Sequence, residues 1–210
     1  MNIEIIPVGP YEVNCYVLWQ AGPEALVFDP GAEADRIESV LSRNGLKVAA
    51  YLLTHGHADH LCALATLHRI RPAPFAMHPE DAEWAFLPRN QIPPHYPAPE
   101  RPQGIFRELS HSQACTDAGL EYRVLATPGH TPGGVCFYFP AERVLISGDT
   151  LFAGSVGRTD RPGGAARVLQ RSLRTLTMLP DDTRVYPGHG PETTIGAEKK
   201  YNIFMRSAGR

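Results

Sequence analysis

Apolar and β-branched residues recur in short runs along the chain, and most of these runs stop at Gly, Pro or Asp. Runs of this length and composition are typical of β-strands that end in turns. They lie at residues 3–8, 14–19, 24–29, 49–54, 122–127, 135–139, 143–147 and 183–187. The pattern therefore predicts a protein that is rich in β-sheet.

Between the strand-like runs, the spacing of apolar residues changes to that of an amphipathic helix. This spacing occurs in residues 34–45, which close on Asn-Gly, and again in residues 165–179, and a further helix is expected over 58–70. Alternation of strands and helices favours a layered α/β sandwich. No internal repeat is present, and the length suits a single domain over residues 1–210.

Residues 87–104 depart from both patterns. They read LPRNQIPPHYPAPERPQG, with proline at positions 88, 93, 94, 97, 99 and 102. Proline at this density excludes a helix or a central strand. We expect a long loop within the domain, serving either as a functional lid or as a disordered segment.

Charge and composition narrow the class of partner. The 20 Lys and Arg residues against 22 Asp and Glu residues leave a net charge of −2, which gives no electrostatic reason to expect nucleic acid or an anionic membrane. A small neutral or anionic molecule is the expected partner. The first residues lack a signal sequence, and no apolar run approaches the roughly 18 residues of a membrane span, which predicts a cytoplasmic protein.

The cysteines give a similar indication. Cys15, Cys62, Cys115 and Cys136 are scattered, without C-x-x-C spacing. This distribution favours neither a zinc finger nor a disulfide framework. Buried free thiols are expected.

Residues 54–60 read THGHADH and crowd metal-capable side chains together. His55 and His57 alternate in a turn after a strand, and Asp59 and His60 begin the following helix. The first pair can point to one position and the second pair to a neighbouring one. Because a catalytic tetrahedral zinc needs only three protein ligands, four candidates imply two adjacent metal positions. The alternative, a solvated polar cluster, requires a chance match to a specific motif.

Three further candidate ligands are placed in the same way. His130, Asp149 and His189 each follow an apolar strand and a turn residue, so we expect them to converge with the first four on one rim. The remaining histidines lie outside these motifs and are expected to be surface or structural residues: His68, His78, His95 and His111.

These segments together resemble the metallo-β-lactamase fold superfamily, and within it the short glyoxalase II-like (hydroxyacylglutathione hydrolase-like) hydrolases of bacteria. The resemblance covers nearly the whole chain. It rests, in the family's order, on FDPG with Asp29, THGHADH, TPGHTPGG with His130, ISGDTLF with Asp149, and YPGHGP with His189. It implies an α/β fold, a four-layer αββα sandwich of two mixed sheets with the metal site at one edge.

The resemblance also implies roles for the individual residues. His55, His57 and His130 would hold one metal ion, Asp59, His60 and His189 a second, and Asp149 would bridge both. Zinc is the expected metal, with iron or manganese as alternatives. Asp59 and Asp149 would be the carboxylates of the catalytic centre, acting with a metal-bridging hydroxide, and Asp29 is expected to be structural or to support the ligands without contacting the metal.

Two divalent metal ions held side by side would favour a hydrolytic reaction. Ions about 3.5–4 Å apart can share a water and lower its pKa from 15.7 toward about 7, which provides a nucleophile without Ser or Cys. No G-x-S-x-G motif is present to suggest otherwise. A thiolate leaving group, with a pKa near 8.5, needs little help from an acid. Hydrolysis of S-lactoylglutathione or a related small acyl thioester is therefore the leading expectation.

Substrate recognition departs from the glyoxalase II pattern. Residues 190–210 are too few for the family's helical glutathione-binding extension, and Asp160 stands where the family has a Tyr. Arg158 replaces a substrate-binding Lys and can pair with a substrate carboxylate, or form a structural ion pair with Asp160. Tyr11 and Phe152 are candidate walls of the pocket by family likeness, and either can equally belong to the core.

Other functions remain open. Persulfide dioxygenases share this fold but use a single iron, held by two His and one carboxylate. A metallo-β-lactamase or lactonase is a further hydrolase alternative, and a non-catalytic metal-binding module would be expected to show an eroded ligand set, which this chain does not show. A nuclease is disfavoured by the charge.

Overall fold

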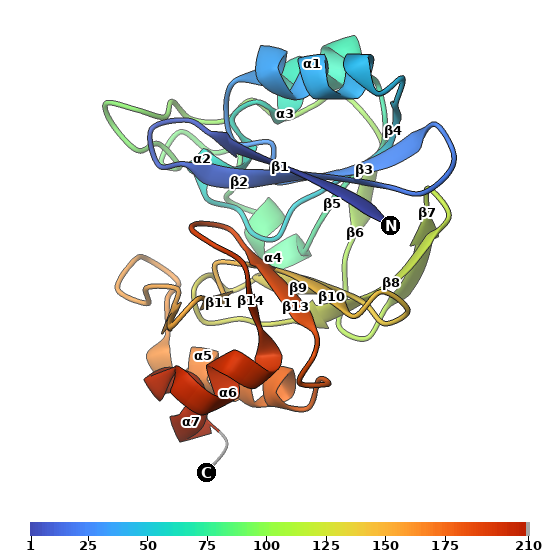
Figure 1. The fold of residues 1–210 in the computed structure, drawn as a ribbon. Helices are drawn as coiled ribbons and strands as arrows, with labels where there is room; N and C mark the ends of the chain where they lie inside the picture. Colours follow the sequence, from blue (N-terminus) through green and yellow to red (C-terminus); the bar gives the residue numbers. More distant parts are fainter. Residues whose placement is uncertain (209–210) are drawn as a thin grey trace. The chain divides into compact units, whose positions relative to one another are not determined.

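A computed structural model describes residues 1–208 of the chain (Figure 1). The chain forms two compact units. The first comprises Met1–Leu109 and Thr116–Leu120, and the second comprises Ser110–Cys115 and the described residues from Glu121 onward. The single domain expected over residues 1–210 stays a prediction. None of the helices in the described part of the chain is long and apolar enough to cross a membrane.

The first unit contains a mixed six-stranded sheet in the order β1-β2-β3-β4-β5-β6. The first three strands are antiparallel, and β3 to β6 run parallel. The strands are β1 (Asn2–Val8), β2 (Val13–Trp19), β3 (Glu24–Phe28), β4 (Lys47–Leu52), β5 (Phe75–Met77) and β6 (Phe106–Glu108). The apolar pattern of the sequence predicted β1 to β4. It did not predict β5 and β6, which have three residues each.

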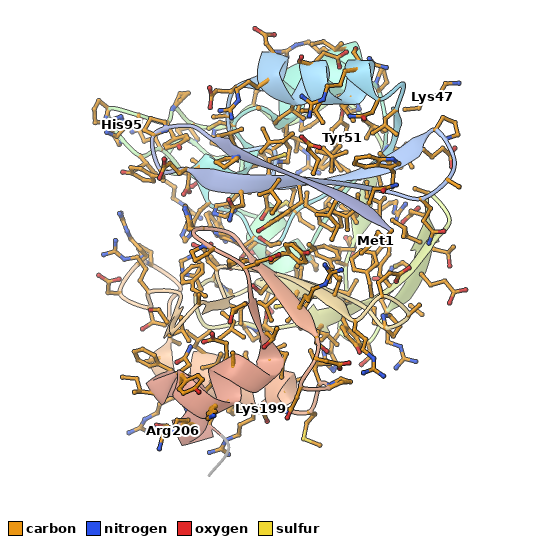
Figure 2. All side chains as sticks on the ribbon, in the orientation of Figure 1. Met1, Lys47, Tyr51, His95, Lys199 and Arg206 are labelled. Atoms are coloured by element: carbon orange, nitrogen blue, oxygen red, sulfur yellow. The ribbon has the colours of Figure 1, made fainter. Side chains whose placement is uncertain are left out.

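Helices α1 (Ala34–Arg43) and α3 (Leu64–Ile70) cover one face of this sheet (Figure 1). Tyr51 lies on β4 beneath this helical layer, and its hydroxyl donates to the carbonyl of Arg71 at 2.9 Å (Figure 2). The helices bury apolar side chains against the sheet, which supplies most of their stability. The short helices α2 (Ala58–Leu61) and α4 (Pro79–Ala82) complete the unit.

The prediction of a single helix over residues 58–70 is wrong in one respect, because this segment forms two separate helices, α2 and α3. The break lies at Cys62 and Ala63, where the amide of Ala63 donates to the carbonyl of Pro30 at 3.0 Å. A continuous helix would direct that amide to Asp59 four residues back. The carbonyl of Asp59 instead lies against Gly31, so close that a Cβ on Gly31 would be 1.8 Å from its oxygen. This close approach requires the glycine of the FDPG motif.

The second unit contains most of a mixed six-stranded sheet in the order β14-β13-β10-β9-β8-β7, of which the end of β7 and the first residue of β8 are grouped with the first unit, and a two-stranded sheet of β11 and β12. The strands are β7 (Ala114–Asp117), β8 (Leu120–Ala126), β9 (Val135–Phe139), β10 (Val144–Gly148), β11 (Leu151–Phe152), β12 (Ser155–Val156), β13 (Arg184–Pro187) and β14 (Thr193–Thr194). Helices α5 (Ala166–Thr177), α6 (Ile195–Tyr201) and α7 (Ile203–Ala208) gather on one side of this larger sheet (Figure 1). Leu169, Leu173 and Leu176 form the buried stripe of α5, as the helical spacing predicted.

Strand direction places the candidate ligands in both units. β8 and β10 are each antiparallel to β9, and β10 is parallel to β13, so β8, β10 and β13 all point the same way. Their carboxyl ends therefore meet at one edge of the second sheet. In the first sheet, β3 and β4 are parallel, which brings the residues after both strands to a common edge.

The proline-rich segment 87–104 lacks regular secondary structure apart from an isolated bridge between Ile92 and Tyr96. It is nevertheless fastened to the first unit along its length. The hydroxyl of Tyr96 accepts from the amide of Tyr11 at 3.2 Å, and the guanidinium of Arg101 lies over the ring of Phe106. His95 lies on the outer part of this segment (Figure 2). These contacts favour an ordered loop, and its role as a lid stays a prediction.

The four cysteines are not joined in disulfides, as expected. Cys15 and Cys136 are buried, and burial raises the pKa of the Cys136 thiol to about 11. Cys62 and Cys115 are only partly buried, which corrects the expectation that the thiols are buried. Burial together with the Asp59 carboxylate raises the pKa of Cys62 to about 12, so this thiol is protonated at neutral pH.

Candidate metal centre

The first unit brings four candidate ligands together, and we call this group the first half-site: His55, His57, Asp59 and His60. The ring centroids of His55 and His57 are 4.9 Å apart, and those of His55 and His60 are 4.1 Å apart. His60 Nε2 lies 3.8 Å from a carboxylate oxygen of Asp59. Three of the four side chains are buried, and His57 is partly exposed. The turn after β4 thus gathers these four side chains, and their roles as metal ligands stay predictions.

Two histidines of the first half-site are held through Nδ1 by a buried network around Asp29. One carboxylate oxygen of Asp29 accepts from the amide of Thr54 at 2.8 Å, and the other accepts from the Thr54 hydroxyl at 2.6 Å. His60 Nδ1 lies 3.0 Å from Asp29, so it donates to that carboxylate. Because the Thr54 hydroxyl already donates, it can only accept from His55 Nδ1, which is 3.0 Å away. This network assigns the proton to Nδ1 on both rings.

These contacts show how Asp29 supports the histidines: it accepts hydrogen bonds from Thr54 and His60. Asp29 follows β3 with φ 45°, in the left-handed region that Asp tolerates better than most residues. Thr54 supplies the intervening hydroxyl, and the sequence reading missed this residue although it directly precedes the histidines.

The second unit contains the second half-site: His130, Asp149 and His189. One carboxylate oxygen of Asp149 lies 3.4 Å from His130 Nε2 and 3.7 Å from His189 Nε2. His130 Nδ1 lies 2.8 Å from the carbonyl oxygen of Arg158, which can only accept, so Nδ1 carries the proton here as well. Asp149 therefore lies next to both imidazoles, and its role as a ligand of two metal ions stays a prediction.

The donor set fits divalent metal ions. A histidine that binds a metal usually donates its other ring N–H to a carboxylate or a carbonyl, which fixes the ring and its tautomer. His60 and His130 show that arrangement, and His55 donates to a hydroxyl that in turn donates to a carboxylate. Within the first unit, a carboxylate oxygen of Asp29 and ring nitrogens of His55 and His60 all lie within 4.8 Å of one another, which agrees with the network that fixes the two rings. Imidazole and carboxylate ligands suit zinc, iron and manganese.

The predicted substrate residues are placed differently. The ring of Phe152 lies 6.2 Å from that of His189, beside a candidate ligand. Tyr11 is 41% exposed and lies next to His95, with ring centroids 5.7 Å apart. Its position at the surface excludes the alternative of a core residue.

Arg158 forms an ion pair with Asp160, the structural alternative that the sequence allowed. Its Nε and terminal nitrogen donate to the two carboxylate oxygens at 2.6 and 2.7 Å. Hydrogen bonding from Arg158 lowers the pKa of Asp160 to about 2. Both side chains are largely exposed, so the guanidinium remains accessible from solvent. Substrate binding by Arg158 stays a prediction.

Comparison with known proteins identifies the family. Residues 8–189 match the sequence model of the metallo-beta-lactamase superfamily. The chain is also 35% identical to the hydroxyacylglutathione hydrolase GloC of Haemophilus influenzae over 212 residues, covering 99% of each chain. The chain therefore belongs to the metallo-β-lactamase superfamily, and its predicted resemblance to hydroxyacylglutathione hydrolases is confirmed.

Solved structures agree with this assignment. BLEG-1, a B3 metallo-beta-lactamase, is 36% identical with a TM-score of 0.90, over 97% of this chain and 99% of that one. TTHA1623, solved in a di-iron-bound form, is 38% identical with a TM-score of 0.85, over 96% of this chain and 99% of that one. The predicted fold class is confirmed: an α/β protein with two mixed sheets and the metallo-β-lactamase fold.

Proposed function

We propose that this protein is a dinuclear metal-dependent hydrolase that cleaves small acyl thioesters of the S-lactoylglutathione type. The observation that carries the proposal is the fixing of His55, His60 and His130 through Nδ1. This leaves Nε2 of each ring as the atom that can bind a metal. The identity of 35% to a hydroxyacylglutathione hydrolase supports the choice of substrate class.

The two half-sites would together hold two ions. His55, His57 and His130 would bind one ion, Asp59, His60 and His189 the other, and Asp149 both. Zinc is the expected metal, and the di-iron form of TTHA1623 supports iron as the alternative. When bound, two such cations supply a water-derived nucleophile at neutral pH and stabilise negative charge that develops on the substrate.

The side chains around the metals have separate tasks. Asp29 and Thr54 keep the Nδ1 protons in place, so the ligand rings do not reorient during turnover. Phe152, beside His189, provides an apolar wall for the acyl or thiol part of the substrate. Arg158 attracts a carboxylate of the thiol carrier. A thiolate needs no protonation to leave near neutral pH, which removes the need for a catalytic acid.

The decisive experiment combines metal analysis with a substrate panel. Protein purified without chelator is expected to contain close to two divalent ions per chain and to hydrolyse S-lactoylglutathione measurably but with a high KM. The same preparation stripped by chelator, and then reloaded, is the matched control. Fully metallated protein that cleaves no thioester would overturn the proposal.

The same panel tests the competing functions. A β-lactamase is favoured by the similarity to BLEG-1, and hydrolysis of a chromogenic β-lactam faster than any thioester would establish it. A persulfide dioxygenase predicts one tightly held iron per chain, no gain of a second ion, and oxygen uptake with a persulfide. A non-catalytic module predicts binding of metal with no turnover of any of these substrates.

A further inference from the structure

The peptide groups of Gly56, between His55 and His57, are held from both sides by buried side chains. The amide of Gly56 donates to a carboxylate oxygen of Asp81 at 2.8 Å, and its carbonyl accepts from Asn90 Nδ2 at 2.7 Å. Neither partner of Gly56 belongs to one of the sequence motifs, because Asp81 lies in α4 and Asn90 lies in the proline-rich segment 87–104. Both peptide groups that link the two histidines are thus fixed by residues far along the chain.

Burial makes these contacts costly to lose. Asp81 is fully buried and Asn90 is 7% exposed. Asn90 Nδ2 also donates to the carbonyl of Ala85 at 2.6 Å, so both of its hydrogens are used on carbonyl oxygens. Loss of a buried partner leaves the other group unsatisfied, without water to replace it. The turn therefore has one favourable arrangement.

The ring of Trp84 packs against the turn and restricts its main chain further. A Cβ on Gly56 would lie 3.1 Å from the ring of Trp84 and 3.3 Å from the Cβ of Ala85. The same ring lies against His57, with centroids 5.6 Å apart and an interplanar angle of 61°. Trp84 thus contacts both the main chain of the turn and one of the candidate ligands.

We infer that Asp81 and Asn90 are positioning residues that set the spacing and orientation of His55 and His57 for metal binding. The inference rests on the metal-holding role proposed above for these histidines. It also gives the start of segment 87–104 a task of its own, since Asn90 supports the metal centre from a region whose composition indicated only a loop. A displacement of Gly56 would move both imidazoles, because they flank it directly.

The sharpest variant is Asn90→Asp, which keeps the size of the side chain but places a carboxylate against two carbonyl oxygens. We expect the zinc affinity of metal-stripped protein, measured by competition with a chromophoric chelator, to fall about 10- to 100-fold, the range for residues that support metal ligands. Asn90→Ala, which removes the donor without adding repulsion, should show a smaller loss. Asp81→Ala should also weaken binding, and Asp81→Asn should restore most of it because an acceptor remains.

Two controls separate positioning from general destabilisation. Glu38→Gln and Asn44→Ala alter hydrogen bonds in the first unit outside the turn, to Arg71 and to the carbonyl of Val40. Glu38→Gln makes the same acid-to-amide change as Asp81→Asn, and Asn44→Ala makes the same change as Asn90→Ala. Unfolding temperatures of all metal-free variants are measured alongside, and the controls should bind zinc as the parent protein does. If Asn90→Asp does not fold, Asn90→Ala against Asn44→Ala provides the same comparison.

The visible spectrum of cobalt-loaded protein provides a second readout that does not depend on turnover. Asn90→Asp should change the cobalt absorption bands, whereas Asn44→Ala should not. Zinc affinity and cobalt spectra of folded Asn90 and Asp81 variants equal to those of the parent would overturn the inference. Failure of the proposed function is distinct: the parent protein would then bind zinc, with the variants weakened, but cleave no thioester.

Discussion

The two half-sites bring similar candidate ligands together in different ways. In the first, four candidate ligands come from one short stretch, His55 to His60, and the rings of His55 and His60 are fixed by side chains, Asp29 and Thr54. In the second, His130, Asp149 and His189 come from three strand ends, and His130 is fixed by a main-chain carbonyl. The candidate ligands that lie close together in the sequence are held in place by side chains from elsewhere in the chain. Those that are far apart in the sequence are placed by the strands of the sheet that they follow.

The difference has a consequence for robustness. The first half-site depends on the identity of its supporting residues, because only certain side chains accept from a histidine or donate to a carbonyl. The second depends on the pairing of β8, β9, β10 and β13, which many sequences can satisfy. Substitutions near the two half-sites should therefore differ in kind, and the following predictions test that.

The largest effect is expected from Asp149→Ala. This carboxylate lies within 3.7 Å of Nε2 of both His130 and His189, so its loss should release at least one of the two ions and abolish measurable hydrolysis. Metal content by mass spectrometry and turnover of S-lactoylglutathione check this. Asp160→Ala, in the same unit, is the control and should retain both ions. If Asp149→Ala retained two ions per chain, the proposal that Asp149 binds both metals would be wrong.

A smaller, substrate-dependent effect is expected from Arg158→Ala. If the guanidinium binds a substrate carboxylate, kcat/KM for a carboxylate-bearing thioester should fall roughly 10- to 150-fold, the equivalent of a hydrogen bond to a charged group. Metal content should not change, because His130 contacts the main-chain carbonyl of residue 158 and not its side chain.

Two comparisons sharpen this prediction. A thioester without the carboxylate should be cleaved equally by Arg158→Ala and the parent protein. Asp160→Asn, which removes the charge that Arg158 now pairs with, should leave the activity on the carboxylate-bearing substrate unchanged or raise it. Equal losses on both thioesters would indicate a damaged loop and end the case for substrate binding.

In the first half-site, Asp29→Asn should weaken metal binding although residue 29 is not a proposed ligand. Asn tolerates the left-handed backbone of this position but cannot accept at both side-chain atoms, so a donor from Thr54 or His60 loses its partner. We expect a loss of about 1–3 kcal/mol in the free energy of unfolding and about 10- to 100-fold in zinc affinity. Chelator competition and urea unfolding of metal-free protein measure the two, and an unchanged zinc affinity would contradict the role of the Asp29 network.

The smallest effect concerns the scaffold of the first unit. Hydrogen bonding from Arg71 holds the pKa of Glu38 below its usual value of about 4.3. A lowered folded-state pKa gives stability that is present above the unfolded value and is lost as the pH falls through the folded one. Glu38→Gln should therefore be less stable than the parent at pH 7, by about 1 kcal/mol, and the difference should shrink below about pH 4. Urea unfolding of metal-free proteins across this range measures it, and a constant difference would contradict it.

The sequence predicted most of what the two half-sites contain and little of what supports them. All seven candidate ligands follow strands that the apolar pattern located, and Asp29 was recognised as a supporting residue. Asp81 and Asn90 were not recognised, because a single Asp in PEDA and a single Asn among prolines have no spacing that relates them to Gly56. Their contacts arise only when α4 and segment 87–104 pack against the turn.

The errors in secondary structure have the same origin. The apolar spacing of residues 58–70 suits one helix, and contacts with Pro30 and Gly31, which the spacing does not show, accompany its division. Strands β5 and β6 are too short for a period of two to be visible, and they exist because each pairs with a neighbour in the sheet. Long periodic segments were predictable, whereas features that depend on a distant partner were not.

The carbonyl that fixes His130 is present whatever amino acid stands at position 158. Under the proposed function, natural variation or directed evolution could therefore exchange the side chain at position 158, and with it the preference for one substrate over another, while this restraint on the ring of His130 persists. Such separation of selectivity from assembly would allow related enzymes to diverge in substrate by changes in one loop, without first rebuilding the centre that performs the chemistry.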